Sequence, residues 1–152
     1  MNNFLNKLIR QAAENHANQS ITGPENQQLL SSSLVANVQA FKDAFSYPEN
    51  ISLKIRELQN PTIHMELVIL FLEGAVETTT IEKHIIEPLL NPSLLLTSYK
   101  DISLDILKGT LTTSSGTQLH NFQDCLNSLF SGNTLILFEG FAEVLSIETP
   151  GF

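Results

Sequence analysis

The apolar positions of this chain change their spacing along its length, and each spacing predicts a different element. From residue 34 to 45 apolar residues recur every three or four positions, which predicts an amphipathic helix. The serines at 31–33 supply hydroxyls that can cap it. Residues 51–57 alternate between apolar and polar side chains, as in a strand with one face in water. Residues 65–72 are almost all apolar, which indicates a central strand covered on both faces.

A second helix is predicted over residues 78–90. Thr79 and Glu82 have the spacing of a capping box, so the helix is expected to begin there. Pro88 lacks an N–H and crowds the preceding turn, so it is expected to bend or break the helix.

The last third of the chain predicts a helix followed by a hairpin. After a short helix near Ser103 and a short strand at 110–113, residues 118–131 carry apolar side chains at helical spacing. Gly132 stands where a C-terminal helix cap is expected. Residues 134–148 then predict a strand, a tight turn and a second strand.

Together these elements predict an α/β fold. It would contain a small mixed β-sheet of about four to five strands with packed helices, including a C-terminal β-hairpin. Residues 1–30 are rich in Asn, Gln and Ser and are expected to form a flexible polar leader. Residues 31–152 are then enough for one folded domain.

The same dipeptide follows two of the apolar strands, as Glu73-Gly74 and as Glu139-Gly140. Glycine readily adopts the positive φ that tight turns require, so Gly74 and Gly140 are structural turn residues. Glu73 and Glu139 are the interaction candidates, because two carboxylates at strand ends can act as general acid and base if they converge on one cleft. The alternative is that each is a solvated turn residue.

Composition narrows the choice of function. The formal net charge is −8, which repels the phosphates of nucleic acids and anionic membrane surfaces. No apolar run approaches the roughly 20 residues that cross a bilayer, so any membrane part is expected downstream of this domain. The four histidines lack metal-ligand spacing, and the single cysteine, Cys125, fits a helix-core position better than a nucleophile. No glycine-rich phosphate loop is present. The sequence therefore predicts no catalytic, cofactor-binding or metal-binding residue.

Lys42, Lys54 and Arg56 are the nearest approach to a basic cluster. Aromatic side chains that could stack on bases are not interleaved with them. We interpret them as part of a solvated face, and the alternative is a charged rim that meets another subunit.

Several of these segments, taken in order, resemble the A subunits of GerA-type spore germinant receptors. The resemblance covers the chain from about residue 30 to its end. Its most specific part is residues 131–134 leading into the final apolar strand and hairpin, and the helical segment 85–90 supports it. The family usually has Asp-Gly where this chain has Glu73-Gly74 and Glu139-Gly140.

The resemblance implies the first soluble subdomain of the N-terminal region of such an A subunit, with a second subdomain and membrane spans downstream. It implies a non-catalytic assembly and signal-coupling role in a receptor that responds to nutrients and triggers spore germination. The implied partners are a transporter-like B subunit, a lipoprotein C subunit and other A subunits. The implied location is the spore inner membrane, with this domain on the cytoplasmic, spore-core side. Nutrient recognition is generally attributed to the B subunit, so no ligand pocket is assigned here.

A second hypothesis belongs to a different functional class. The chain would be a stand-alone small α/β ligand-binding protein or hydrolase, with a cleft beside the sheet. Glu73 and Glu139 would then have to face that cleft together.

Overall fold

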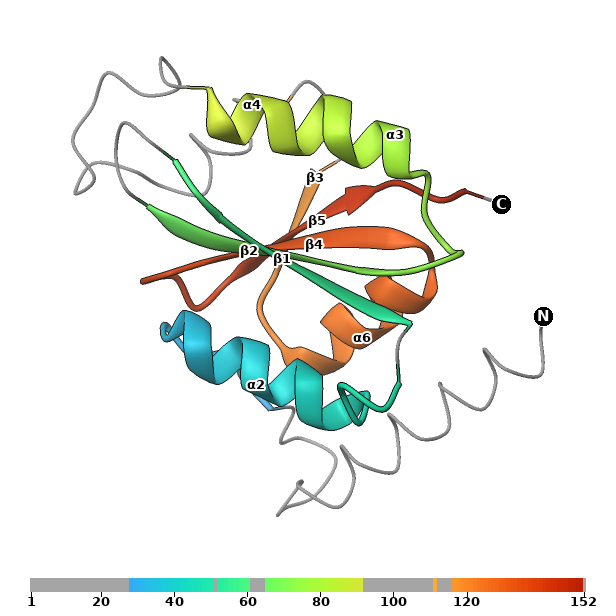
Figure 1. Ribbon diagram of the computed structural model, residues 1–152. Coiled ribbons are helices and arrows are strands. Elements are labelled where there is room, and N and C mark those ends of the chain that lie inside the picture. The colour runs from blue at the N-terminus through green and yellow to red at the C-terminus, as the bar shows by residue number, and fades with distance from the viewer. Residues whose placement is uncertain (1–27, 51, 61–64, 92–110, 112–115, 152) are drawn as a thin grey trace.

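The computed structural model describes residues 28–50, 52–60, 65–91, 111 and 116–151. These residues form a five-stranded sheet with helices packed on both faces (Figure 1). Its strands are β1 (Leu53–Gln59), β2 (Glu66–Leu72), β3 (Gly116–Leu119), β4 (Asn133–Phe138) and β5 (Val144–Glu148). Their order across the sheet is β1-β2-β4-β5-β3, and all four pairings are antiparallel.

The described helices form one layer on each face of the sheet (Figure 1). One layer contains α2 (Leu34–Ala44) and α6 (Phe122–Phe130). The other contains a continuous helical segment made of α3 (Thr78–Ile81), the π-helical turn η1 (Glu82–Ile86) and α4 (Glu87–Leu90). The predicted α/β class with packed helices and a C-terminal hairpin is confirmed. The sequence suggested a mixed sheet, whereas the described pairings are all antiparallel, because the long connection from β2 to β4 lets β4 enter the sheet from either end.

The central strands β2 and β4 are buried on both faces, as the continuous apolar run in β2 predicted. Their side chains alternate between the two helical layers. The layer of α2 and α6 covers Val68, Leu70 and Leu72 of β2 together with Leu135 and Leu137 of β4. The layer of α3, η1 and α4 covers Leu67 and Ile69 of β2 together with Ile136 and Phe138 of β4.

The start of α2 is held by hydrogen bonds from within its own segment. Ser33 is the N-cap, and its Oγ accepts a hydrogen bond from the Ala36 N–H at 3.2 Å. Asn37 is buried; its Oδ1 accepts from Ser31 N at 2.8 Å, and its Nδ2 donates to Ser31 O at 2.7 Å. The predicted serine cap is therefore confirmed.

The start of α3 differs from the prediction. Glu77 is the N-cap, and its carboxylate accepts a hydrogen bond from the Thr79 N–H at 3.1 Å. The predicted helix over residues 78–90 is confirmed, but the predicted capping box of Thr79 and Glu82 is wrong. The physical reason is that a carboxylate at this position both accepts an orphan N–H and interacts favourably with the helix dipole.

Pro88 lies inside the same helical segment without ending it. The wider π-helical turn η1 directly precedes it, with the Glu87 N–H donating to Glu82 O. This widening makes room where a proline ring would crowd a regular α-helical turn. At the end of the segment, buried Asn60 donates from Nδ2 to Leu89 O at 2.8 Å and so joins α4 to the end of β1.

The last helix starts later than its apolar spacing predicted. Its expected first residues belong to the edge strand β3, and α6 begins at Phe122. Asn121 marks this boundary, because its Oδ1 accepts a hydrogen bond from the Asp124 N–H at 2.8 Å. Gly132 follows α6 with φ of 87° and donates from its N–H to Leu129 O at 3.0 Å, which confirms the predicted cap.

Two other expected elements lie outside the described residues. These are the short helix near Ser103 and the strand at 110–113, of which Leu111 alone is described, buried and outside any strand. The expected leader over residues 1–30 is described only at residues 28–30. There Leu30 is buried and its N–H donates to His120 O at 3.3 Å.

Replacing Phe41 with Ala should strongly destabilise the domain. Phe41 is fully buried, and its ring centroid lies 4.7 Å from that of Phe122, so it joins α2 to α6. The free energy of unfolding should fall by about 3–5 kcal/mol, measured by chemical denaturation followed by circular dichroism. The control is Val35→Ala on the same helix, where the side chain is 77% exposed and the change should stay within about 0.5 kcal/mol. Similar losses for the two variants would contradict this packing.

Candidate functional site

The turn between β4 and β5 is attached to the start of α2 through Glu139. One carboxylate oxygen, Oε2, accepts a hydrogen bond from the Leu34 N–H at 3.0 Å. The next residue, Gly140, donates from its N–H to Ser32 O at 2.9 Å. Gly140 has φ of 92°, a conformation that favours glycine. We call these contacts of Glu139 and Gly140 with residues 32–34 the α2 anchor.

The α2 anchor places a negative charge where a helix has unpaired N–H groups and the positive end of its dipole. The same turn also reaches β2, because the Glu139 N–H donates to Glu66 O at 3.1 Å. Glu139 is therefore half-buried and holds a helix, a hairpin and a central strand at one point. Sequence reasoning suggested a carboxylate at this turn but gave no sign of its partner, which is 105 residues away in the chain.

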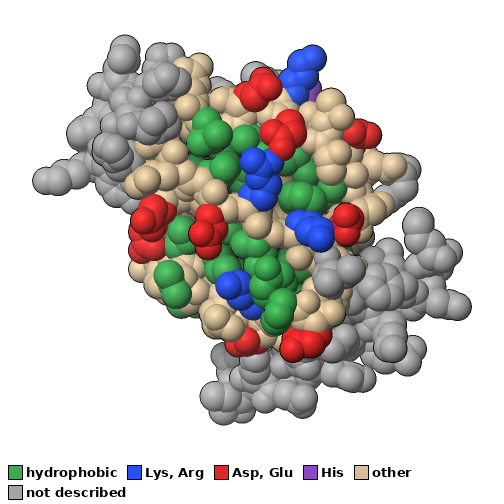
Figure 2. All heavy atoms as spheres, in the orientation of Figure 1, with side chains coloured by type: hydrophobic (Ala, Val, Ile, Leu, Met, Phe, Trp, Pro, Cys, Tyr) green, Lys and Arg blue, Asp and Glu red, His purple; other side chains and the backbone are tan. Residues whose placement is uncertain are grey.

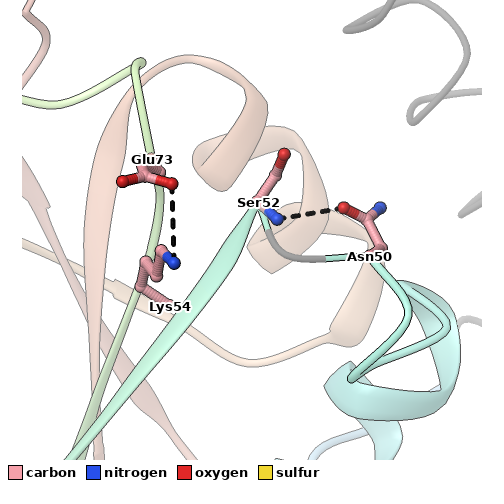
Figure 3. A network of polar contacts seen from close by, with 4 residues as sticks. All are labelled: Asn50, Ser52, Lys54 and Glu73. Carbon is pink, nitrogen blue, oxygen red and sulfur yellow. Dashed lines mark hydrogen bonds and ion pairs between the residues drawn. The ribbon is translucent and has the colours of Figure 1, made fainter.

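Glu73 lies in a different environment at the end of β2 (Figure 3). Its Oε2 is 3.5 Å from Lys54 Nζ, and the two side chains are 63% and 39% exposed. Its N–H donates to Ser52 O at 2.8 Å, while the Ser52 N–H donates to Asn50 Oδ1 at 3.0 Å. Gly74 follows with φ of 86°. Glu73 is thus an exposed turn residue in a surface ion pair, an arrangement that contributes little to stability.

The two carboxylates do not converge. β2 and β4 are antiparallel, so the strand ends that carry Glu73 and Glu139 lie at opposite ends of the sheet. The backbone of Glu139 is bonded to that of Glu66, and Glu73 lies seven positions further along the chain, which is about 23 Å at 3.3 Å per residue. The alternation of side chains also directs Glu73 and Glu139 toward opposite faces. The paired-carboxylate cleft that acid–base chemistry requires is not formed by these residues.

The three basic residues are divided between the faces of the sheet. Lys54 and Arg56 lie on the α3 side of β1, where Arg56 pairs with Glu82. Lys42 lies on α2, with Nζ 5.5 Å from the centroid of the Tyr47 ring. They do not form one basic patch.

A second attachment point, which the sequence reasoning missed, lies where the chain leaves β5. The Glu77 N–H donates to Thr149 O at 2.8 Å, and the Gly151 N–H donates to Ala75 O at 3.0 Å. Val76 and Pro150 form the bridge between these two bonds. We call the pairing of residues 149–151 with residues 75–77 the exit latch. In Figure 1 the red segment that follows β5 passes beside the turn that leads into α3.

The exit latch depends on two buried threonine hydroxyl groups and on a glycine, which has no side chain. Thr149 Oγ1 donates to Gly132 O at 3.0 Å, so its contact with Thr134 Oγ1 at 2.7 Å is one in which Thr134 donates. At Gly151 an added Cβ would lie 2.7 Å from Val76 O, closer than packed atoms approach. The Thr-Pro-Gly sequence of residues 149–151 was the available sequence signal for the latch. Its hydrogen-bond partners are too distant in the chain for a local sequence pattern to indicate them.

Cys125 is buried in α6, and its thiol has low reactivity. Burial, and then the carboxylate of Asp124, raise the pKa of its thiol from 9.0 to about 12. This keeps the thiol protonated at neutral pH, so it is a poor nucleophile. In the part of the chain that the structure describes, no three His, Cys, Asp or Glu side chains gather as they would around a metal ion.

None of the helices within the described ranges has both the length and the apolar character that a membrane crossing requires.

A family model described as the Bacillus/Clostridium GerA spore germination protein matches residues 39–152. The chain belongs to this GerA family. The match runs from within α2 to the exit latch and so includes all five strands and both helical layers. No curated protein sequence matches the chain.

A solved structure shares the fold. It is the N-terminal domain of the A subunit of the Bacillus megaterium spore germinant receptor GerK3, with a TM-score of 0.67 and 21% sequence identity. The similarity covers 84% of this chain and 50% of the other, so the GerA chain described here spans about half of that domain.

Replacing Glu139 with Ala should lower the free energy of unfolding by about 1 kcal/mol, because α2 loses an acceptor and a favourable charge at its start. Glu139→Gln, which keeps an acceptor oxygen, should lose less. Glu73→Ala is the matched control at the other Glu-Gly turn and should change stability by no more than about 0.5 kcal/mol. Urea denaturation at low salt measures all three. The anchor would be refuted by equal effects at the two turns.

The thiol of Cys125 should react with a disulfide reagent at pH 8 at least about 100-fold more slowly in the folded chain than in the unfolded chain. Its folded pKa lies above its unfolded value, so the unfolded state loses this proton first as pH rises. This group's contribution therefore disfavours the fold increasingly from pH 9 to 12. Reaction rates with and without denaturant, followed by absorbance, provide the measurement, and equal rates would contradict the burial.

Proposed function

We propose that this domain is a non-catalytic assembly and signal-coupling domain of a nutrient germinant receptor that triggers spore germination. Membership of the GerA family and the fold shared with a germinant receptor A subunit support this proposal. The single observation that carries it is the exit latch. Through the latch, the backbone that leaves β5 is bound to the N-cap of α3.

The coupling would be mechanical. A displacement of the segment that leaves the latch acts on Glu77 and on the turn after β2, and β2 is central to the sheet. From β2 the change reaches Glu139 and the start of α2 through the Glu66 backbone. The closed and open latch are then two states that contacts at either end can favour, which is the requirement for coupling between distant sites.

The proposed partners are the transporter-like B subunit and the lipoprotein C subunit of the receptor, together with other A subunits. The proposed location is the spore inner membrane, reached through a part of the protein beyond this domain, which itself would lie on the spore-core side. Nutrient recognition is assigned to the B subunit. The net charge of −8 argues against direct binding to nucleic acid or to anionic lipid.

The hydrolase alternative is not favoured by any feature of the described residues. It required Glu73 and Glu139 to share a cleft, and they lie at opposite ends of the antiparallel pair β2–β4. The hydrolase alternative is tested by replacing Glu73 or Glu139 with Gln. If the two residues were a catalytic pair, both variants would lose turnover or ligand binding.

The coupling proposal is tested by opening the latch in the full-length subunit in spores. Thr149→Val keeps the shape of the side chain but leaves Gly132 O and Thr134 Oγ1 without their buried partner, which favours the open latch. Germination in response to nutrient should slow by about tenfold, as a coupling change of this size allows. The fall in optical density of a spore suspension measures the rate, and immunoblotting measures the receptor level.

The control is Thr117→Val, the same substitution on the exposed face of β3. It should germinate normally, and both variants should respond normally to a trigger that bypasses the receptor. A Thr149→Val spore with normal receptor level and a normal nutrient response would refute the coupling role.

A further inference from the structure

A groove of about 360 Å³ runs between α2 and the edge of the sheet formed by β1 and β2. On the helix side its lining residues recur at positions 34, 35, 38, 39 and 42, so they form one stripe along α2. Val35 on this stripe is 77% exposed, whereas Val38 beneath it is buried. Figure 2 shows the side of the molecule on which β1 lies in front, where hydrophobic side chains are visible between charged ones. On the sheet side the groove is lined by residues 57–59 of β1 and residues 66–68 of β2.

The sheet side of the groove is an edge strand. β1 pairs with β2 along all seven residues, and within the described ranges no strand pairs with its other side. Such an edge presents backbone N–H and C=O groups that can pair with an added strand. The groove therefore lies next to a row of main-chain donors and acceptors.

The charges that line the groove are mainly negative. Glu57 and Glu66 lie on the α2 side of β1 and β2, both are exposed, and neither forms an ion pair with another described residue. Among the described residues that line the groove, Lys42 is the single cation, and it lies over the Tyr47 ring. Lys54 and Arg56, the cations of β1, face the opposite layer. β1 and β2 thus present two carboxylates to the groove, and no cation of the described residues pairs with either one.

A second copy of this chain is a poor match for the edge. In the antiparallel register that pairs all seven residues of β1 with a symmetric copy, Arg56 faces Arg56. Moving the centre by one residue places Lys54 opposite Arg56 in one direction and Glu57 opposite Glu57 in the other. Like charges directly opposite each other destabilise a strand pair, so the edge favours a partner with a different charge pattern.

We propose that this groove and the outer edge of β1 bind an extended, basic segment of a different protein in the receptor assembly. The segment adds a strand beside β1. On the α2 side it presents Lys or Arg to Glu57 and Glu66, alternating in sequence with side chains that face the other layer. Its aliphatic stems pack on Val35. This inference rests on the proposed assembly function. It specifies the surface through which the domain would assemble and the chemical character of the segment that would bind there.

The test uses a photo-crosslinking amino acid at Val35 in the full-length subunit in spores, with the crosslinked segment identified by mass spectrometry. The expected product joins Val35 to a stretch of another protein in which Lys or Arg occupies alternate positions. No product, a product with a second copy of this chain, or a segment without basic residues would each overturn the proposal.

Charge variants show whether the carboxylates cause the binding. Glu57→Gln combined with Glu66→Gln should reduce the crosslink yield about fivefold at low salt, and added salt should reduce the wild-type yield. The matched control is Glu87→Gln with Glu148→Gln, which removes the same charge from exposed positions outside the groove. Thermal melting checks that both double variants fold. Equal yields for the two would overturn the charge-based recognition.

The outcomes separate this inference from the coupling proposal. If the crosslink fails while Thr149→Val still slows germination, the docking surface is refuted and the coupling role stands. If the crosslink forms while Thr149→Val has no effect, the domain assembles through β1 without transmitting a signal through the latch.

Discussion

The pairing of β2 with β4 is the constraint on which the rest of the structure depends. Its four residue pairs, from Leu67 with Phe138 to Leu70 with Leu135, are all apolar and lie almost entirely out of water. Two such strands side by side need cover on both faces, so α2 and α6 pack on one face and the α3 segment on the other. β1 and β5 then extend the sheet from these two strands. The register of this pair determines which helical layer each side chain of the neighbouring strands faces.

The register also explains why two similar sequences have different roles. β2 and β4 both run an apolar strand into Glu-Gly, and both glycines have positive φ. The side chains at matching positions nevertheless face opposite layers. Glu139 therefore accepts a hydrogen bond at the start of α2, whereas Glu73 forms a surface ion pair with Lys54. Sequence similarity at a turn predicts the turn conformation, because that is local, but not the partner of the carboxylate.

The sequence predicted the elements whose signal is local and strong. Continuous apolar runs predicted β2 and β4, helical spacing predicted α2 and most of α6, and Gly132 predicted a helix end. β3 was missed because it is four residues long and half-exposed, and because Leu119 also fits the helical spacing that continues into α6. The Glu139 anchor and the exit latch were missed for another reason. Their hydrogen bonds join residues more than 70 positions apart, and such contacts leave no pattern in a short window.

The exit latch has a consequence for how the domain opens. β5 pairs with β4 as far as Glu148, so the three latch residues continue directly from a strand that is already in place. Forming the latch therefore orders few residues and closes no long loop. It can therefore detach and reattach as a small local unit while the sheet stays folded. The free energy of that local opening is smaller than the global free energy of unfolding. Gly151 and Thr149 therefore set how often the end of the domain is released while the rest of the sheet stays folded.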